Sequence, residues 1–142
     1  MRATAAALIA VVERMQPEWW TQLRKPGEWS PGKDAEHVAD AAAMHLWHVC
    51  RALGMHQPGP PVVERARLTP VRSQAEVVVL LHTRAEDGAR LIERLTDAQL
   101  DLAAKPARRS PKTVAELVAR PLISHFATHR HAIELKLRAR AE

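Results

Sequence analysis

Two histidines near the carboxyl end of the chain have the spacing of a metal-binding pair. His125 and His129 are four residues apart, so on a helix their imidazoles project from one face, a single turn apart. They continue an apolar stripe that includes Leu122 and Ile133, which directs both rings toward the interior of the fold. A buried imidazole needs a metal ion or a hydrogen bond, because an unpaired polar ring is costly there. The pair alone fits either a metal site or a hydrogen-bonded core, and a metal site needs a third ligand.

The third ligand must come from another element, and the segment 31–53 carries three of the eight histidines of the chain. His37 and His48 are eleven residues apart, or about 16 Å along a helix, so only one of them can complete a site with the pair. His45 lies on the apolar stripe of this segment and is interpreted as a core residue or a support behind the ligands. Surface or loop positions are expected for His56, His82 and His131.

Two short motifs resemble those of a known family of metal-binding helical proteins. Trp29-Ser30, six further residues and then His-Val-Ala-Asp at 37–40 resemble the W-S-x-x-x-x-x-x-H-x-x-D opening of the second helix in the DinB/YfiT-like superfamily. The segment His-Phe-Ala-Thr-His-Arg at 125–130 is similar to the H-x-x-x-H-R motif of the closing helix in the same superfamily. The two motifs occur in the order that the superfamily has.

The resemblance implies that His37, His125 and His129 form a three-histidine site for a divalent metal ion, with further positions left for water or substrate. Three neutral imidazoles leave the full charge on the ion, so a thiol or water bound there is strongly acidified. The ligand set favours zinc and is compatible with nickel, iron or manganese. Asp40, nearly one turn after His37, is interpreted as a surface or structural residue rather than a support for the ligands.

The resemblance further implies metal-dependent transfer of a low-molecular-weight thiol, of the bacillithiol or mycothiol class, to an electrophilic small molecule. Two alternatives stay open: a metal-dependent hydrolase, and a non-catalytic, stress-related metal-binding or interaction protein. Hydrolysis is less favoured because no Glu stands beside the ligand pair to act as a general base. The sequence identifies no catalytic residue beyond the ligands, and it leaves open whether the protein is an enzyme.

The elements that must position these residues are helices. Apolar spacing is helical nearly everywhere and no stretch alternates long enough for a strand, which predicts an all-α, four-helix bundle with long connections after the second and third helices. Pro121 is expected to kink the last helix or to divide it into two consecutive helices. The first helix is expected over residues of about 3–16, and the second over 31–53 with Ser30 as its N-terminal cap. The third helix is expected to begin after Pro70 or Ser73, and the fourth at a cap formed by Ser110 and Pro111. The chain is expected to form one domain over residues 1–142.

Composition narrows the expected partners. Lys and Arg number 21 against 16 Asp and Glu, for a formal net charge of +5, but these basic residues are dispersed along the chain and aromatic residues make up only 4% of it. Nucleic-acid binding usually requires a concentrated basic patch or several exposed aromatic rings, so nucleic acid is not expected as a partner. The amphipathic helices and the small core favour a homodimer.

Cysteine content and hydropathy indicate a compartment. Cys50 is the one cysteine of the chain, which excludes an internal disulfide and suits a reducing compartment. No apolar run is long enough to span a membrane, and the Ala-rich start leads directly into Glu13 and Arg14 without a cleavage region for a secretory signal. A cytoplasmic protein with no membrane partner is therefore expected.

Overall fold

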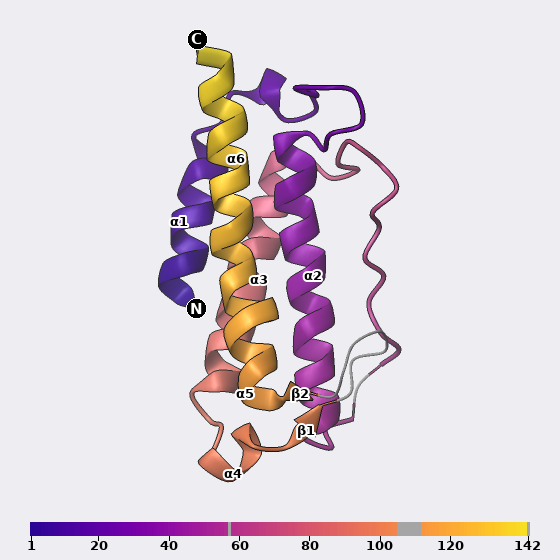
Figure 1. Cartoon of the computed structure of the whole chain (residues 1–142), viewed down its shortest axis with the longest axis vertical. Coiled ribbons are helices and arrows are strands. Elements are labelled where there is room, and N and C mark those ends of the chain that lie inside the picture. Colours follow the sequence, from indigo (N-terminus) through magenta and orange to yellow (C-terminus); the bar gives the residue numbers. More distant parts are fainter. Residues whose placement is uncertain (57, 105–111, 142) are drawn as a thin grey trace.

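The computed structural model describes residues 1–56, 58–104 and 112–141. Within these residues four long helices run along one another and form the body of the molecule (Figure 1). They are α1 (Arg2–Glu13), α2 (Pro31–Ala52), α3 (Gln74–Ile92) and α6 (His125–Ala141). α1 and α2 each pack against both α3 and α6, so the four helices enclose a common core. The predicted all-α class is confirmed.

Capping residues explain where α2 and α3 begin. The Ser30 hydroxyl oxygen accepts a hydrogen bond from the backbone N–H of Lys33 at 3.2 Å, and a proline follows at the first helical position. Ser73 and Glu76 form a capping box before α3, so Ser73 rather than Pro70 is the cap. α2 ends before Gly54, whose φ of 72° is a left-handed conformation that glycine adopts without strain.

The core consists of the apolar stripes of these helices. Its fully buried members include Leu8, Val12, Val38, Val77, Leu81, Leu122, Phe126 and Ile133. A second, smaller cluster lies at the other end of α2 around Val49, Val114 and Leu117. Among the described residues, no helix is both long and apolar enough to cross a membrane.

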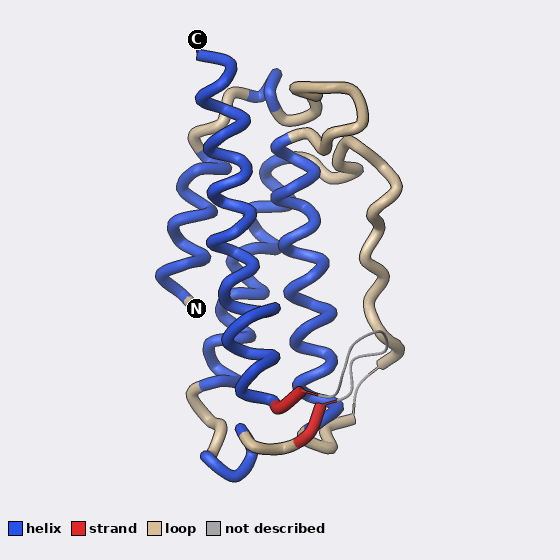
Figure 2. Tube along the Cα trace, in the orientation of Figure 1, coloured by secondary structure: helices blue, strands red, loops and turns tan. Residues whose placement is uncertain are grey.

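The connection after α3 contains short elements that the sequence pattern did not indicate. A one-turn helix, α4 (Asp97–Leu100), follows a capping box formed by Thr96 and Gln99. β1 (Ala103–Ala104) then pairs antiparallel with β2 (Lys112–Thr113) (Figure 2). Each strand has two residues, which is too short for an alternating pattern to be recognised. A further short turn of 3-10 helix, η1 (Pro17–Trp19), follows α1.

The last predicted helix begins later than expected. The cap expected at Ser110 and Pro111 lies outside the described residues. α5 (Val114–Leu117) begins after Thr113, whose side chain caps the helix together with that of Glu116. The same S/T-x-x-E pattern that identifies Ser73 therefore identifies Thr113 as the cap in the described chain.

The interruption expected at Pro121 takes the form of a π-helical segment. This segment, η2 (Val118–Ser124), joins α5 directly to α6 and contains Pro121. Proline has no N–H to donate, and in an α-helix its ring clashes with the carbonyl group one turn before it. The wider π turn is a common way to accommodate this missing hydrogen bond and this clash, and it occurs often at functional sites. Here it leads into His125, the first residue of α6.

Candidate metal centre

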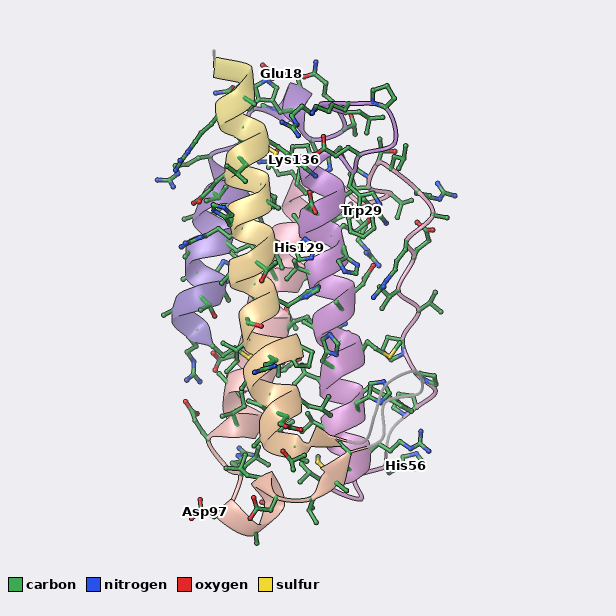
Figure 3. The ribbon with its side chains drawn as sticks, in the orientation of Figure 1. Glu18, Trp29, His56, Asp97, His129 and Lys136 are labelled. Atoms are coloured by element: carbon green, nitrogen blue, oxygen red, sulfur yellow. The ribbon has the colours of Figure 1, made fainter. Side chains whose placement is uncertain are left out.

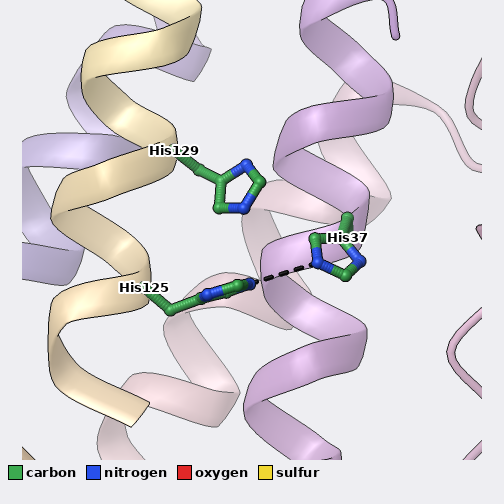
Figure 4. A group of neighbouring side chains, drawn as sticks. All are labelled: His37, His125 and His129. Atoms are coloured by element: carbon green, nitrogen blue, oxygen red, sulfur yellow. Dashed lines mark hydrogen bonds between the residues drawn. The ribbon is translucent and has the colours of Figure 1, made fainter. Parts of the chain in front are cut away.

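Three histidines from two neighbouring helices point toward one another (Figure 4). His37 comes from α2, and His125 and His129 come from α6; their ligand nitrogens all lie within 4.8 Å of one another. The Nε2 atoms of His37 and His125 are 3.2 Å apart. Two nitrogens bound at 2.0–2.1 Å to one tetrahedral ion lie about 3.3 Å apart. The structure thus brings together the three histidines that the sequence motifs indicated, in a group that could hold a metal ion.

The three histidines of the group differ in burial. His37 is buried, whereas His125 and His129 are half-buried. The indole of Trp29 packs against the group, with its ring centroid 4.9 Å from that of His37 and 6.5 Å from that of His129 (Figure 3). The three rings are therefore held by packing, and two of them keep part of their surface exposed.

Burial keeps two of the histidines in the form that a metal ion requires. Burial is the largest cause that lowers the pKa of His37 to about 4 and that of His125 to about 3. Both rings are therefore neutral near pH 7 and have a lone pair to donate. Nδ1 of His37 is buried and has no hydrogen-bond partner within the described part of the chain. Nε2 of the same ring is the atom that faces Nε2 of His125, so it is Nε2, and not Nδ1, that is placed to bind a metal ion.

A buried carboxylate orients the third ring. Asp34 Oδ1 lies 3.0 Å from Nδ1 of His129. An ionised carboxylate can only accept, so Nδ1 carries the proton and Nε2 of His129 is left free to bind a metal ion. Lys136 Nζ donates to Asp34 Oδ2 and, at 2.8 Å, to the carbonyl oxygen of Trp29. This series of hydrogen bonds, from Trp29 through Lys136 and Asp34 to His129, links α6 to the start of α2.

Asp34 and Lys136 were not predicted from the sequence. Asp34 precedes His37 by three residues and Lys136 follows His129 by seven, so each lies on the same helix face as a ligand. That spacing is the signal that could have identified them. Asp40 instead pairs with Arg72, at 3.0 Å between Oδ1 and Nη1. Its role is the structural one that was expected.

The other histidines take no direct part in the group. The ring of His45 packs against that of His125, with 5.9 Å between centroids, so it helps to hold the His125 ring in place. His48 packs against Trp47 instead, with 5.0 Å between ring centroids. Exposed positions are occupied by His56, His82 and His131. Of the α2 histidines, His37 is the one that completes the group.

The low pKa values of His37 and His125 predict how the stability of the metal-free protein depends on pH. The ordinary pKa of a histidine side chain is 6.5, so between about pH 6.5 and 4 the unfolded chain binds more protons than the folded one. The contribution of the two rings to stability is complete above this window and is lost as the pH falls through it. With a chelator present, the Tm measured by circular dichroism should fall from about pH 7 to 4.5.

The combined variant His37→Gln, His125→Gln should show a flatter dependence of Tm on pH. The exposed His82→Gln should keep the wild-type slope, since its ring is solvated in both states. A wild-type slope in the combined variant would contradict the assignment of these two rings as the buried, neutral histidines.

Solved structures with the same fold are found at low sequence identity. A DinB-like protein from Bacillus cereus ATCC 10987 is 19% identical, with a TM-score of 0.74, over 97% of this chain and 86% of that one. An uncharacterized protein from Clostridium difficile 630 is 13% identical, with a TM-score of 0.73, over 96% of this chain and 91% of that one. Comparison with curated proteins finds no significant match.

A third structure corrects an expectation about partners. The colibactin self-resistance protein ClbS, crystallised in complex with double-stranded DNA, is 14% identical, with a TM-score of 0.67, over 96% of this chain and 90% of that one. This relative contradicts the exclusion of nucleic acid drawn from dispersed charge. The exclusion was wrong because dispersion along a sequence does not determine where charges lie on the folded surface, where helices bring distant residues together.

The sequence comparison agrees with the fold and with the two histidine motifs. A model of the DinB superfamily matches residues 1–133, which reach all four predicted segments and include the three histidines. The match covers α1, α2, α3 and the part of α6 that carries the ligand pair. The chain therefore belongs to the DinB superfamily.

Proposed function

We propose that His37, His125 and His129 bind one divalent metal ion, preferably zinc, and that the protein transfers a low-molecular-weight thiol to an electrophilic small molecule at this site. The observation that carries the proposal is the convergence of three ring nitrogens within 4.8 Å on a half-buried position. Two of the rings are held neutral by burial, and the third is oriented by Asp34. Such a set leaves room for a further ligand, as catalytic rather than structural zinc sites do.

The residues around the group suit a thiol substrate. A divalent ion on three neutral imidazoles keeps its full charge and would favour the thiolate form of a thiol. Trp29 packs over the group and limits access of water from its side. The positive charge of Arg65, on the connection after α2, acts on both His37 and His125, so it also favours an anionic co-substrate.

Cobalt substitution tests the proposal directly. With cobalt(II) bound, addition of a small thiol should produce a sulfur-to-cobalt charge-transfer band in the wild-type protein and none in His129→Ala. Consumption of the thiol by a halogenated aromatic electrophile should depend on His129 in the same way. Cys50→Ser, which removes the one thiol of the protein itself, should leave both results unchanged.

Other outcomes of this experiment would favour the two alternatives. Ester or amide turnover that rises with pH and needs no thiol would favour a metal-dependent hydrolase. Full metal occupancy without a spectral response to thiols and without turnover would favour the non-catalytic, stress-related metal-binding protein. Either result would overturn the proposed thiol transfer.

A second candidate function is DNA binding. It is supported by the complex of the structural relative ClbS with double-stranded DNA and by the net charge of +5 of this chain. If the candidate holds, fluorescence anisotropy of a labelled duplex should rise with protein at about 50 mM salt, and the affinity should fall steeply by about 200 mM. An unchanged anisotropy at the lower salt concentration would eliminate it.

We further propose that residues 1–142 form one domain, that the protein is cytoplasmic and that it forms a homodimer. The dimer is the simplest to test, because the chain has a mass of 15.8 kDa. Light scattering should give about twice that mass for a dimer, and a mass near that of one chain would contradict it.

A further inference from the structure

A groove separate from the metal centre lies between the second halves of α2 and α3. It has a volume of about 730 Å³, within the range of small-molecule pockets, and none of the three histidines lines it. The start of the connection after α2 closes one side through Met55 and Pro58. The groove is thus framed by two packed helices and by the start of the connection after α2. Figure 1 shows this connection running beside α2.

The walls of the groove are largely apolar. Leu46 and Trp47 of α2 face Leu91 and Leu95 from α3 and its end. The Trp47 indole N–H donates to the carbonyl oxygen of Pro58 at 2.7 Å, so its polar atom is satisfied and the ring is held in place. A wall of this kind gains most from an apolar body, because burial of apolar surface is favourable in proportion to its area.

The rim of the groove carries an excess of positive charge. Three arginines line it, Arg84, Arg90 and Arg94, against one acidic residue, Asp87. Arg84 lies 4.0 Å from Asp87, and Arg90 pairs with Glu86 at 2.9 Å. The exposed guanidinium of Arg94 has no hydrogen bond or ion pair to any residue that the structure describes. The groove therefore has one cation that an incoming anion can pair with without breaking an existing contact.

We propose that this groove binds a small molecule with an apolar chain or ring and a single carboxylate, which pairs with Arg94. The apolar body lies along Leu46, Leu91 and Leu95. The planar guanidinium of arginine matches a carboxylate with two parallel hydrogen bonds, which gives the site its preference for this anion. The site is independent of the metal centre and of thiol transfer.

Cys50 reports on occupancy of the groove. It lines the groove and is half-buried. Because it is the one cysteine of the chain, the rate of thiol alkylation measures the accessibility of this position alone. Burial raises the pKa of its thiol, so alkylation by iodoacetamide is best measured in mildly alkaline buffer. A molecule in the groove should slow the reaction by covering the sulfur.

The experiment compares decanoate with decylamine, which has the same chain and the opposite charge. Decanoate should slow alkylation of Cys50 about tenfold at saturation, and decylamine should have little effect. Arg94→Gln should raise the half-protecting decanoate concentration about tenfold, a change that corresponds to the loss of one ion pair with a carboxylate. The matched control Arg138→Gln, on exposed α6 surface, should leave that concentration unchanged.

Two checks keep the result interpretable. The Tm of Arg94→Gln should equal that of the wild type, since the side chain is exposed, and His125→Ala should show the same protection by decanoate, since the metal centre is not involved. No protection by decanoate, equal protection by decylamine, or equal protection in Arg94→Gln would each overturn the proposal. Loss of protection in His125→Ala would place the carboxylate at the metal centre instead and would overturn it as well.

Discussion

Alanine at His37, His125 or His129 is expected to abolish stoichiometric metal binding, whereas the untagged wild-type chain should hold one divalent ion after dialysis. Each substitution removes one of three ring nitrogens that lie within 4.8 Å of one another. Two remaining imidazoles leave an ion mostly hydrated and weakly held. Metal content should be measured by elemental analysis on protein dialysed against a slight excess of zinc.

Surface histidines provide the matched controls for this loss. His82→Ala and His131→Ala remove exposed rings from α3 and α6 and should leave the metal content unchanged. An ion present at 100 times its dissociation constant stabilises the folded state by about 2.7 kcal/mol, so chelation should lower the wild-type Tm by several degrees and leave the three variants unaffected. Full occupancy in His125→Ala would rule out the assignment of the ligands.

Asp34→Asn should weaken the metal site without removing a ligand. The carboxylate that fixes the Nδ1 proton of His129 becomes an amide, which can present either a donor or an acceptor to the ring. Loss of such a support usually lowers metal affinity by about 10- to 100-fold. Asp40→Asn, on the same helix but paired with Arg72, should leave the zinc affinity measured by competition with a chelating dye unchanged.

Glu36→Gln is expected to be the most destabilising substitution among the charged residues described. Lys33 and Glu36 have exposed fractions of 1% each, and their charged atoms are 3.1 Å apart. Glu36 also accepts hydrogen bonds from the backbone N–H groups of Val71 and Arg72, at 3.0 and 3.1 Å. An amide at this position leaves the buried ammonium of Lys33 with one carboxylate partner, Glu64, which is 40% exposed. Removing one member of a buried pair typically costs about 3–5 kcal/mol of unfolding free energy.

Urea unfolding followed by circular dichroism measures this effect, and Glu28→Gln is the matched control. Glu28 pairs with Arg24 on the surface, at 3.0 Å, in a contact that solvent screens. Its loss should change the urea midpoint only slightly. Equal midpoints for the two variants would show that the Lys33–Glu36 pair does not stabilise the start of α2.

The parts of the fold that were predicted are those determined by short-range pattern. Apolar periodicity and the Ser30 and Ser73 caps locate α2 and α3, because caps and stripes depend on residues within one or two turns. The histidine pair of α6 follows from helix geometry in the same way. The two-residue strands could not be predicted, since their pairing depends on where the ends of the connection meet.

The contacts that orient the ligands depend on packing between helices far apart in the chain. Asp34 lies on α2 and reaches His129 and Lys136 on α6. Asp34 and Lys136 each lie within a helix and belong to no short sequence motif, so the neighbouring sequence does not identify them as part of the metal centre. Only the relative rotation of α2 and α6 determines that they meet, and this rotation is set by the packing of the whole core.

The π-helical segment before α6 allows the last helix to vary in length by one residue. A π turn contains about one residue more than an α turn, so η2 is equivalent to a regular helix with one residue inserted. Deleting one residue from Val118–Ser124 would let this segment close into a regular α-helix, so His125 and His129 would keep nearly the same direction relative to α5. The same deletion in a regular α-helix would turn every later residue by about 100°, so η2 is the place where the last helix can lose one residue and keep the centre. Homologous centres are best sought by aligning α5 and α6 separately, with a one-residue gap allowed between them.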